Sequence, residues 1–254
     1  PYATNYDETA NVDDGSCTYP DNGDYSLSFD GVNDYVDVGS FNVGNGSQIT
    51  LSAKVKFSEI IDKPEIIVSK YEGDNGQDNN VINRSFDLYR HDAERQYKFY
   101  FTISSDGINT EEFSSTTSAE PNVWYDIVAT FNNGVAKLYI NGILENSHSS
   151  STIFNINSSD VPVLIGATSE ISVPGSATNY LTGNIDNVGI LNTALTQEEI
   201  QSYMSTPPTG NEVGLTGYWK FNAGDDTTLY DHSGNGNHGT INGASWVTNG
   251  TKYV

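Results

Sequence analysis

The stretch NVWYDIVATFNNGVAKLYINGIL, residues 122–144, decides the fold of this chain. It contains two runs of alternating residues, 123–131 and 135–140, which are joined by Asn-Asn-Gly at 132–134. Asn and Gly tolerate the positive φ that a tight turn needs, so the stretch predicts a β-hairpin. One face of both runs is apolar and the other is mixed, which predicts a sheet with one buried face. A lone hairpin is marginal in water, so a whole sandwich must surround it.

The same alternation returns on both sides of the hairpin, for example over 49–57 and 96–104. One helix is predicted at 197–204, because Thr196 and Glu199 have the spacing of a capping box and a Pro-Pro pair follows. Strands of this kind, with a single short helix, predict an all-β fold made of two antiparallel sheets.

The chain is strongly acidic, with 33 Asp and Glu residues against 11 Lys and Arg residues and a formal net charge of −22. Such a surface repels nucleic acid and anionic membranes and attracts divalent cations. Solubility in a salty medium explains the charge equally well. No apolar run approaches the roughly 20 residues that a membrane span needs.

Four stretches resemble one known family. They are the hairpin itself, SLSFDGVNDYVDVG at 26–39, LTGNIDNVGILNTALTQEEIQSYM at 181–204 and GLTGYWKFNAGDDTTLYDHSGNGNHGTINGASWV at 214–247. Together they resemble LamG-like jelly-roll domains, which are relatives of laminin G and pentraxins in the concanavalin A-like lectin/glucanase superfamily. The resemblance implies that the two sheets form a jelly roll.

The domain organisation follows from the same comparison. Residues 25–254 are predicted to form the LamG-like domain. The last of the four stretches commonly opens such a domain, so residues 215–247 are predicted to complete the sandwich in a permuted order; the alternative is that they begin a second, truncated domain. Residues 1–24 resemble part of a short acidic repeat or a linker, and their Cys17 has no second cysteine in the chain. Half of a disulfide framework favours a secreted or cell-surface protein with neighbouring domains.

A calcium ion is the predicted cofactor. Calcium prefers six to eight hard oxygens, which loops supply from carboxylates and carbonyls. The resemblance implies that the turn at 30–31, Asp186 and the Gly-rich loop at 231–237 meet at one edge of the sandwich. The alternative is that the turn carboxylates only cap nearby N–H groups. The predicted ligands are Asp30, Gly31, Asp186, Asp231, Gly234 and Asn235.

A glycan is the predicted partner. Sugars pack their C–H faces on aromatic rings and bond to flanking planar polar side chains. Such residues on the non-core faces of the predicted strands are Tyr89, Arg90, Tyr100, Trp124, Asp126 and Tyr139.

Catalysis is not expected. In the glycosidases of the superfamily that the chain resembles, one strand carries the motif Glu-x-Asp-x-x-Glu. The nearest counterpart in this chain, NIDNVG at 184–189, has one acidic residue and no glutamate. Hydrolysis of a glycosidic bond needs two carboxylates that flank it. The sequence therefore predicts a non-catalytic carbohydrate-binding module. A protein-binding adhesion or spacer domain is the alternative, and a polysaccharide-degrading enzyme is the least favoured hypothesis.

Overall fold

The structure is a computed structural model. Of the predicted acidic segment, residues 1, 6, 8 and 10–16 lie outside the part that it describes. The described residues are 2–5, 7, 9, 17–41, 43, 46–73, 83–170 and 176–249.

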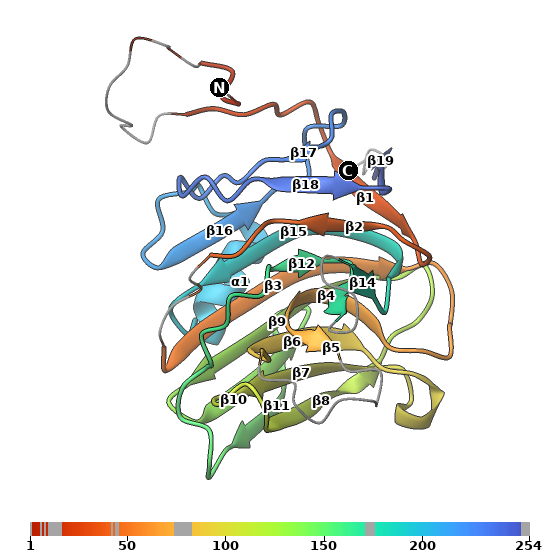
Figure 1. Cartoon of the computed structure of the whole chain (residues 1–254), viewed down its shortest axis with the longest axis vertical. Coiled ribbons are helices and arrows are strands. Elements are labelled where there is room, and N and C mark those ends of the chain that lie inside the picture. The colour runs from red at the N-terminus through yellow and green to blue at the C-terminus, as the bar shows by residue number, and fades with distance from the viewer. Residues whose placement is uncertain are drawn as a thin grey trace.

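Two large antiparallel sheets lie face to face, as Figure 1 shows. The first, sheet A, has the strand order β11-β10-β9-β3-β15-β1-β19, and β16 also pairs with β15. Its strands are β1 (Tyr25–Asp30), β3 (Gln48–Phe57), β9 (Trp124–Asn132), β10 (Val135–Ile140), β11 (Ile143–Ser149), β15 (Thr182–Leu191), β16 (Leu215–Trp219) and β19 (Ser245–Thr248).

The second, sheet B, has the order β17-β18-β2-β12-β4-β6-β7-β8. Its strands are β2 (Tyr35–Asp37), β4 (Glu65–Lys70), β6 (Phe86–Arg90), β7 (Lys98–Ser104), β8 (Thr110–Ser118), β12 (Leu164–Ile165), β17 (Thr228–Leu229) and β18 (Gly239–Asn242). A small third sheet contains β5 (Glu72–Gly73), β13 (Thr168–Glu170) and β14 (Ala177–Thr178), and a 3₁₀ helix spans Ala93–Arg95. The predicted all-β jelly-roll sandwich is confirmed.

The hairpin forms as its sequence predicts. β9 and β10 pair antiparallel on either side of the turn, where Asn133 and Gly134 have φ values of 47° and 90°. On β9, Tyr125, Ile127 and alternate residues beyond them are buried in the core. The intervening side chains face away from the core, on the outer face of sheet A.

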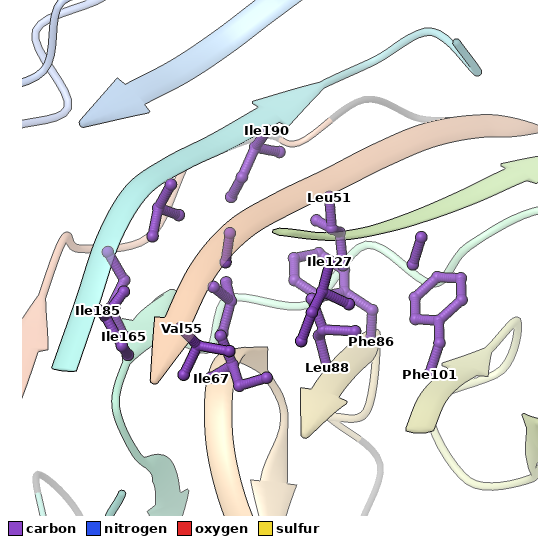
Figure 2. Packing of buried hydrophobic residues seen from close by; sticks show 14 of the residues in the cluster. Leu51, Val55, Ile67, Phe86, Leu88, Phe101, Ile127, Ile165, Ile185 and Ile190 are labelled. Atoms are coloured by element: carbon purple, nitrogen blue, oxygen red, sulfur yellow. The ribbon is translucent and has the colours of Figure 1, made fainter. Parts of the chain in front are cut away.

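The core lies between the two sheets. Figure 2 shows Leu51, Val55 and Ile127 of sheet A packed toward Ile67 and Phe86 of sheet B. Because strands alternate, every second residue of a central strand joins this layer and its neighbours point outward. The outer faces therefore hold the side chains that are available to partners.

The predicted helix is α1 (Gln197–Ser205), and it lies on the outer face of sheet A. Its capping box is present: the Thr196 hydroxyl accepts from the Glu199 N–H, and the Glu199 carboxylate accepts from the Thr196 N–H. Ile200 is its buried residue and packs against Val128 and Tyr139 of the sheet. Among the described residues, no helix has the length and apolar character that a membrane span requires.

Strands from the C-terminal stretch enter both sheets. β16 pairs with β15 and β19 pairs with β1 in sheet A, while β18 pairs with β2 in sheet B. The N-terminal segment contacts the same region, since the Tyr19 ring stacks on Tyr230 at 5.4 Å between ring centroids. These contacts bring the start of β1 and the residues after β19 together.

Candidate functional site

A row of charged side chains crosses the outer face of sheet A. Lys54 of β3 lies opposite Asp126 of β9 on one side and opposite Asp186 of β15 on the other. In the next row, Lys56 lies between Trp124 and Asn184 in the same way. The two lysines alternate with core residues along β3, so the pleat directs both of them outward.

Trp124 is the aromatic residue of this row of charged side chains. It is half-buried, and the Lys54 and Lys56 ammonium nitrogens lie 5.6 and 5.1 Å from the centroid of its ring. Cation–π contacts at such partly exposed sites contribute only about 0.5–1 kcal/mol. A ligand can therefore displace both lysine side chains from the Trp124 ring.

A bulge in β15 shapes the centre of the face. The pairing of β15 with β3 shifts register between Asp186 and Gly189, and Asn187 within the bulge has a φ of 48°. Asn tolerates this left-handed conformation better than most residues do. The bulge brings the Asn187 amide beside Tyr218 of β16, whose hydroxyl donates to Asn187 Oδ1 at 3.1 Å.

Two cavities open along this surface. The first, of about 280 Å³, lies between sheet A and α1, and Lys54, Asp126 and Asn187 contribute its polar lining together with Ser52. The second contains Asp24, Tyr25, Asp186, Lys220 and Asn222. Asn187, Tyr218 and the Pro207-Pro208 pair line both cavities, so they form one continuous groove, the sheet A groove.

Two of the predicted ligand residues lie on sheet B instead. The rings of Tyr89 and Tyr100 stack at 5.5 Å between centroids on its outer face, but only 8% and 9% of these residues is exposed. His91 packs edge-on against Tyr100, and the Tyr89 hydroxyl donates to Glu112. Burial of the phenol raises the pKa of Tyr89 well above its usual value. Neighbouring side chains therefore cover most of this ring pair.

Two further predicted ligand residues are buried away from solvent. Arg90 lies in the interior, is fully buried and forms an ion pair with Glu65. Tyr139 is 2% exposed and packs beneath α1 against Ile200. Arg90 and Tyr139 are therefore corrected from ligand-binding to structural residues. The six predicted residues divide among two outer faces and the interior. Asp126 lines the sheet A groove, and Trp124 lies two residues away from it on the same face of β9.

The structure places the first predicted calcium ligands in a self-contained turn. Asp30 Oδ1 accepts from the Val32 and Asn33 N–H groups at 2.8 and 3.4 Å. The Gly31 carbonyl already accepts from the Lys63 ammonium at 2.9 Å. Asp30 Oδ1 therefore caps its own turn, as in the capping alternative, and the Gly31 carbonyl is occupied by a lysine from another segment.

Asp231 is satisfied in the same way. Its Oδ1 accepts from the Tyr218 and Ser233 N–H groups, and its Oδ2 accepts from the Ser233 hydroxyl and the Asn237 N–H. In the following loop, Gly234 takes a φ of 80°, and the Asn235 amide nitrogen donates to the Leu215 carbonyl at 3.0 Å. Asp231 therefore holds its loop together with four hydrogen bonds.

Asp186 differs from the other two carboxylates. It is 2% exposed, and its Oδ1 has no hydrogen-bond partner among the described residues. Burial raises the pKa of Asp186 to about 7; the Asp24 charge adds to this shift and Lys54 opposes it. Within the described ranges, no three His, Cys, Asp or Glu side chains gather as a metal site would require. The predicted set of three aspartates is thus not brought together.

The chain also matches known proteins. The family model that it matches is described as the concanavalin A-like lectin/glucanases superfamily, and the match covers residues 30–201. The chain belongs to this superfamily. No curated protein sequence matches the chain.

Solved structures with the superfamily fold resemble the chain at low sequence identity. A putative carbohydrate-binding protein from Bacteroides ovatus superposes with a TM-score of 0.68 and 18% identity, over 91% of this chain and 61% of that protein. A heptameric SAP-like pentraxin from Limulus polyphemus gives a TM-score of 0.58 and 15% identity, over 78% and 92%. The CBM40 of a Ruminococcus gnavus sialidase, bound to α2,3-sialyllactose, superposes with a TM-score of 0.51 and 16% identity, over 70% of this chain and 96% of that domain. This chain therefore spans less than two thirds of the length of the Bacteroides ovatus protein.

Several residues of the groove and of the charged row beside it escaped the sequence prediction. Lys54 and Lys56 had a signal, because they alternate with apolar residues and are two of only 11 basic residues. Asn187 and Tyr218 had none, since their proximity depends on a bulge and on the pairing of β15 with β16. Superfamily membership gives the fold, but it does not specify such side-chain groupings.

Proposed function

We propose that the chain is a non-catalytic carbohydrate-binding domain whose ligand lies in the sheet A groove. The observation that carries the proposal is a half-buried Trp124 two residues along β9 from Asp126, which lines a cavity with few, convergent polar groups. Pockets for small ligands combine apolar walls with a small number of placed polar side chains. The sugar ring packs on Trp124, while Asp126 and Asn187 bond to its hydroxyl groups.

The similar structures support this proposal. Of those that share the fold, one is a putative carbohydrate-binding protein and another is a module bound to sialyllactose. We infer the same general role for this domain within a secreted or cell-surface protein of several domains. The net charge of −22 fits a partner other than nucleic acid.

A binding role fits the carboxylates of the groove better than hydrolysis does. Hydrolysis requires two carboxyl groups that reach the same glycosidic bond from opposite sides. Asp126 and Asp186 lie on either side of Lys54, and Asp186 is 2% exposed. The Lys54 side chain therefore separates the two carboxyl groups, which do not form a facing pair. Release of reducing sugar or unsaturated uronate from any polysaccharide would contradict the non-catalytic assignment.

Replacing Trp124 with Ala is expected to weaken glycan binding at least about tenfold, which corresponds to about 1.4 kcal/mol. The loss arises because the sugar no longer has a ring face to pack on. A glycan array with the whole chain identifies a ligand, and titration calorimetry with that ligand measures the loss.

The matched control is Phe154→Ala, because Phe154 is an aromatic residue that is 56% exposed and belongs to none of the strands of sheet A. We expect this variant to bind glycan as the unchanged chain does. Unchanged binding by the Trp124 variant would place the glycan elsewhere, with the Tyr89–Tyr100 face as the next site to test.

Protein binding remains the second candidate function, and an exposed apolar group favours it. Ile143, Leu144 and Met204 are 64%, 40% and 40% exposed, and Met204 lies next to Gly142 at the end of β10. Contiguous apolar surface of this kind often marks contacts between proteins. Absence of any glycan ligand on the array, together with saturable binding to a cell-surface protein, would favour this function.

A further inference from the structure

A third cavity continues the sheet A groove toward the N-terminal segment. It has a volume of about 330 Å³ and shares Thr209 and Lys220 with the second cavity, whose volume is about 490 Å³. Pockets for small ligands range from about 300 to 1,000 Å³. The first cavity alone, at about 280 Å³, is at the lower end of this range, whereas the three together reach its upper end. The three joined cavities, the extended groove, therefore have room for a ligand larger than a single sugar.

The added part of the groove has walls that the superfamily match does not include. The match covers residues 30–201. The third cavity lies between the N-terminal segment, residues 17–24, and two C-terminal loops at 209–211 and 232–234. Every residue that lines it lies outside the matched region, so this part of the groove is a feature of the chain rather than of the shared fold.

Several contacts hold the N-terminal segment in place. The Asn22 backbone N–H donates to the Asn222 carbonyl at 2.9 Å, and the Asn22 side-chain amide donates to the Ala223 carbonyl at 2.6 Å. The Tyr19 ring, which lines the third cavity, stacks on the Tyr230 ring. A wall that is already ordered loses little entropy when a ligand binds against it. The segment is thus a preformed side of the extended groove.

The charges of the extended groove indicate which glycans it can take. Its charged lining consists of two lysines, Lys54 and Lys220, and four aspartates, Asp21, Asp24, Asp126 and Asp186. His232 adds no charge at neutral pH, because burial and then the nearby Lys220 charge lower its pKa to about 4. Together with the net charge of −22, the excess of aspartates repels an anionic sugar. Charged side chains form strong hydrogen bonds with the uncharged hydroxyl groups of a neutral sugar instead.

We propose that the N-terminal segment completes the binding site, because it forms the far wall of an extended groove that takes an uncharged linear oligosaccharide. This inference rests on the proposed function and adds a second region of contact to it. One end of the oligosaccharide lies at Trp124 and the first cavity. The other end passes between Lys220, which donates to sugar hydroxyl groups, and the Tyr19 ring, on which a sugar packs.

Titration calorimetry with oligosaccharides of increasing length tests the proposal. The probes are cello-, laminari-, manno- and xylo-oligosaccharides, from disaccharide to hexasaccharide, and the protein is the whole chain. We expect at least one series to bind, with an affinity that rises at least about tenfold from the disaccharide to the hexasaccharide. The rise occurs because only the longer chain extends from Trp124 to Lys220. Oligouronates of the same lengths should bind more weakly.

Two variants at the far end of the extended groove locate the added contacts. Lys220→Ala and Tyr19→Ala should each weaken hexasaccharide binding at least about tenfold, because a charge-assisted hydrogen bond or a ring face is lost. Both should bind the disaccharide as the unchanged chain does, whereas Trp124→Ala should weaken binding at both lengths. Lys98→Ala is the matched control, since Lys98 is half-buried like Lys220 but lies in β7 of sheet B; its binding should be unchanged. Circular dichroism shows whether each variant is folded.

The possible results separate this inference from the proposed function. Absence of binding by all the uncharged series at millimolar concentrations would overturn the inference. An affinity that does not rise with length, tighter binding of the oligouronates, or unchanged hexasaccharide binding by both the Lys220 and Tyr19 variants would overturn it too. Each of these last three results can occur while Trp124→Ala still weakens disaccharide binding. In that case the sheet A groove remains the binding site and the N-terminal segment is not part of it.

Discussion

Replacing Glu65 with Gln is expected to lower the melting temperature by about 10 °C. Glu65 and Arg90 form an ion pair in which both side chains are fully buried. Removing one partner of a buried pair costs about 3–5 kcal/mol, because the other charge remains without compensation in a low-dielectric site. For a domain of this size each kcal/mol moves the melting temperature about 2–4 °C. Differential scanning calorimetry measures the shift.

The surroundings of the pair explain why the effect is large. The Arg90 guanidinium also donates to the carbonyls of Glu59 and Ile61 at 3.2 and 3.4 Å. Its carbon atom lies 4.5 Å from the centroid of the Phe57 ring. Glu65 Oε1 accepts from the Thr182 N–H at 2.8 Å. Loss of the Glu65 charge therefore disturbs the connection between sheet A and sheet B as well as the pair itself.

An exposed pair of the same type is the control. Arg95 and Glu112 form an ion pair whose side chains are 42% and 40% exposed. Exposed pairs contribute about 0.2–1 kcal/mol, so Arg95→Gln should lower the melting temperature by at most about 4 °C. Equal effects of the two substitutions would show that burial does not determine the strength of the Glu65–Arg90 pair.

The fold was predictable because its signals are local. The Asn133-Gly134 turn and the Thr196–Glu199 capping box each act within a few residues, and both appear where the sequence indicates them. The alternation of apolar and polar residues identified the buried face of β9 in the same way. Local signals of this kind need no knowledge of which strands become neighbours.

Arg90 shows where the sequence prediction failed. Tyr89 and Arg90 are adjacent on one strand, so they cannot both face outward unless a bulge lies between them. Phe86 and Leu88 are core residues, and the same alternation takes Arg90 inward. An inward Arg is tolerated only because Glu65, from another strand, lies beside it. That pairing is a tertiary contact that the local sequence does not contain.

The candidate site was only partly predictable for the same reason. Trp124 and Asp126 were identified from their outward phase on the hairpin. Their neighbour Lys54 and the opposite Asp186 depend on strand register across three strands, and register is a property of the folded sheet.

Replacing Asp87 with Asn is expected to stabilise the protein at pH 7 and to remove a pH dependence. Asp87 lies on the outer face of sheet B, opposite Ser69 of β4 and Thr102 of β7. It is 7% exposed, and its Oδ1 has no hydrogen-bond partner among the described residues. Burial raises the pKa of Asp87 well above 3.8 in the folded protein. The ionised form is therefore costly at neutral pH.

The sign of the pH dependence follows from proton binding. Above about pH 4 the unfolded chain loses this proton, whereas the folded protein keeps it up to a higher pH. The folded state then binds more protons than the unfolded state, so the free energy of unfolding falls as the pH rises through this interval. Below about pH 4 both states are protonated and the contribution is constant. The Asn variant has no such proton, so its stability should exceed that of the unchanged chain only above this pH.

The size of the effect is set by the cost of an unsatisfied buried group, about 1–3 kcal/mol. The variant should therefore melt about 2–12 °C higher at pH 7, and the melting temperatures of the two proteins should approach each other near pH 4. Melting is measured by circular dichroism between about pH 4 and pH 8, with a chelator present so that metal binding does not contribute. Asp225→Asn is the control, because Asp225 is exposed and the substitution removes the same unit of charge. If the Asp225 variant gains as much stability as the Asp87 variant, the effect comes from the overall negative charge of the protein. A stability difference that is the same at every pH would show that Asp87 does not titrate differently in the folded and unfolded states.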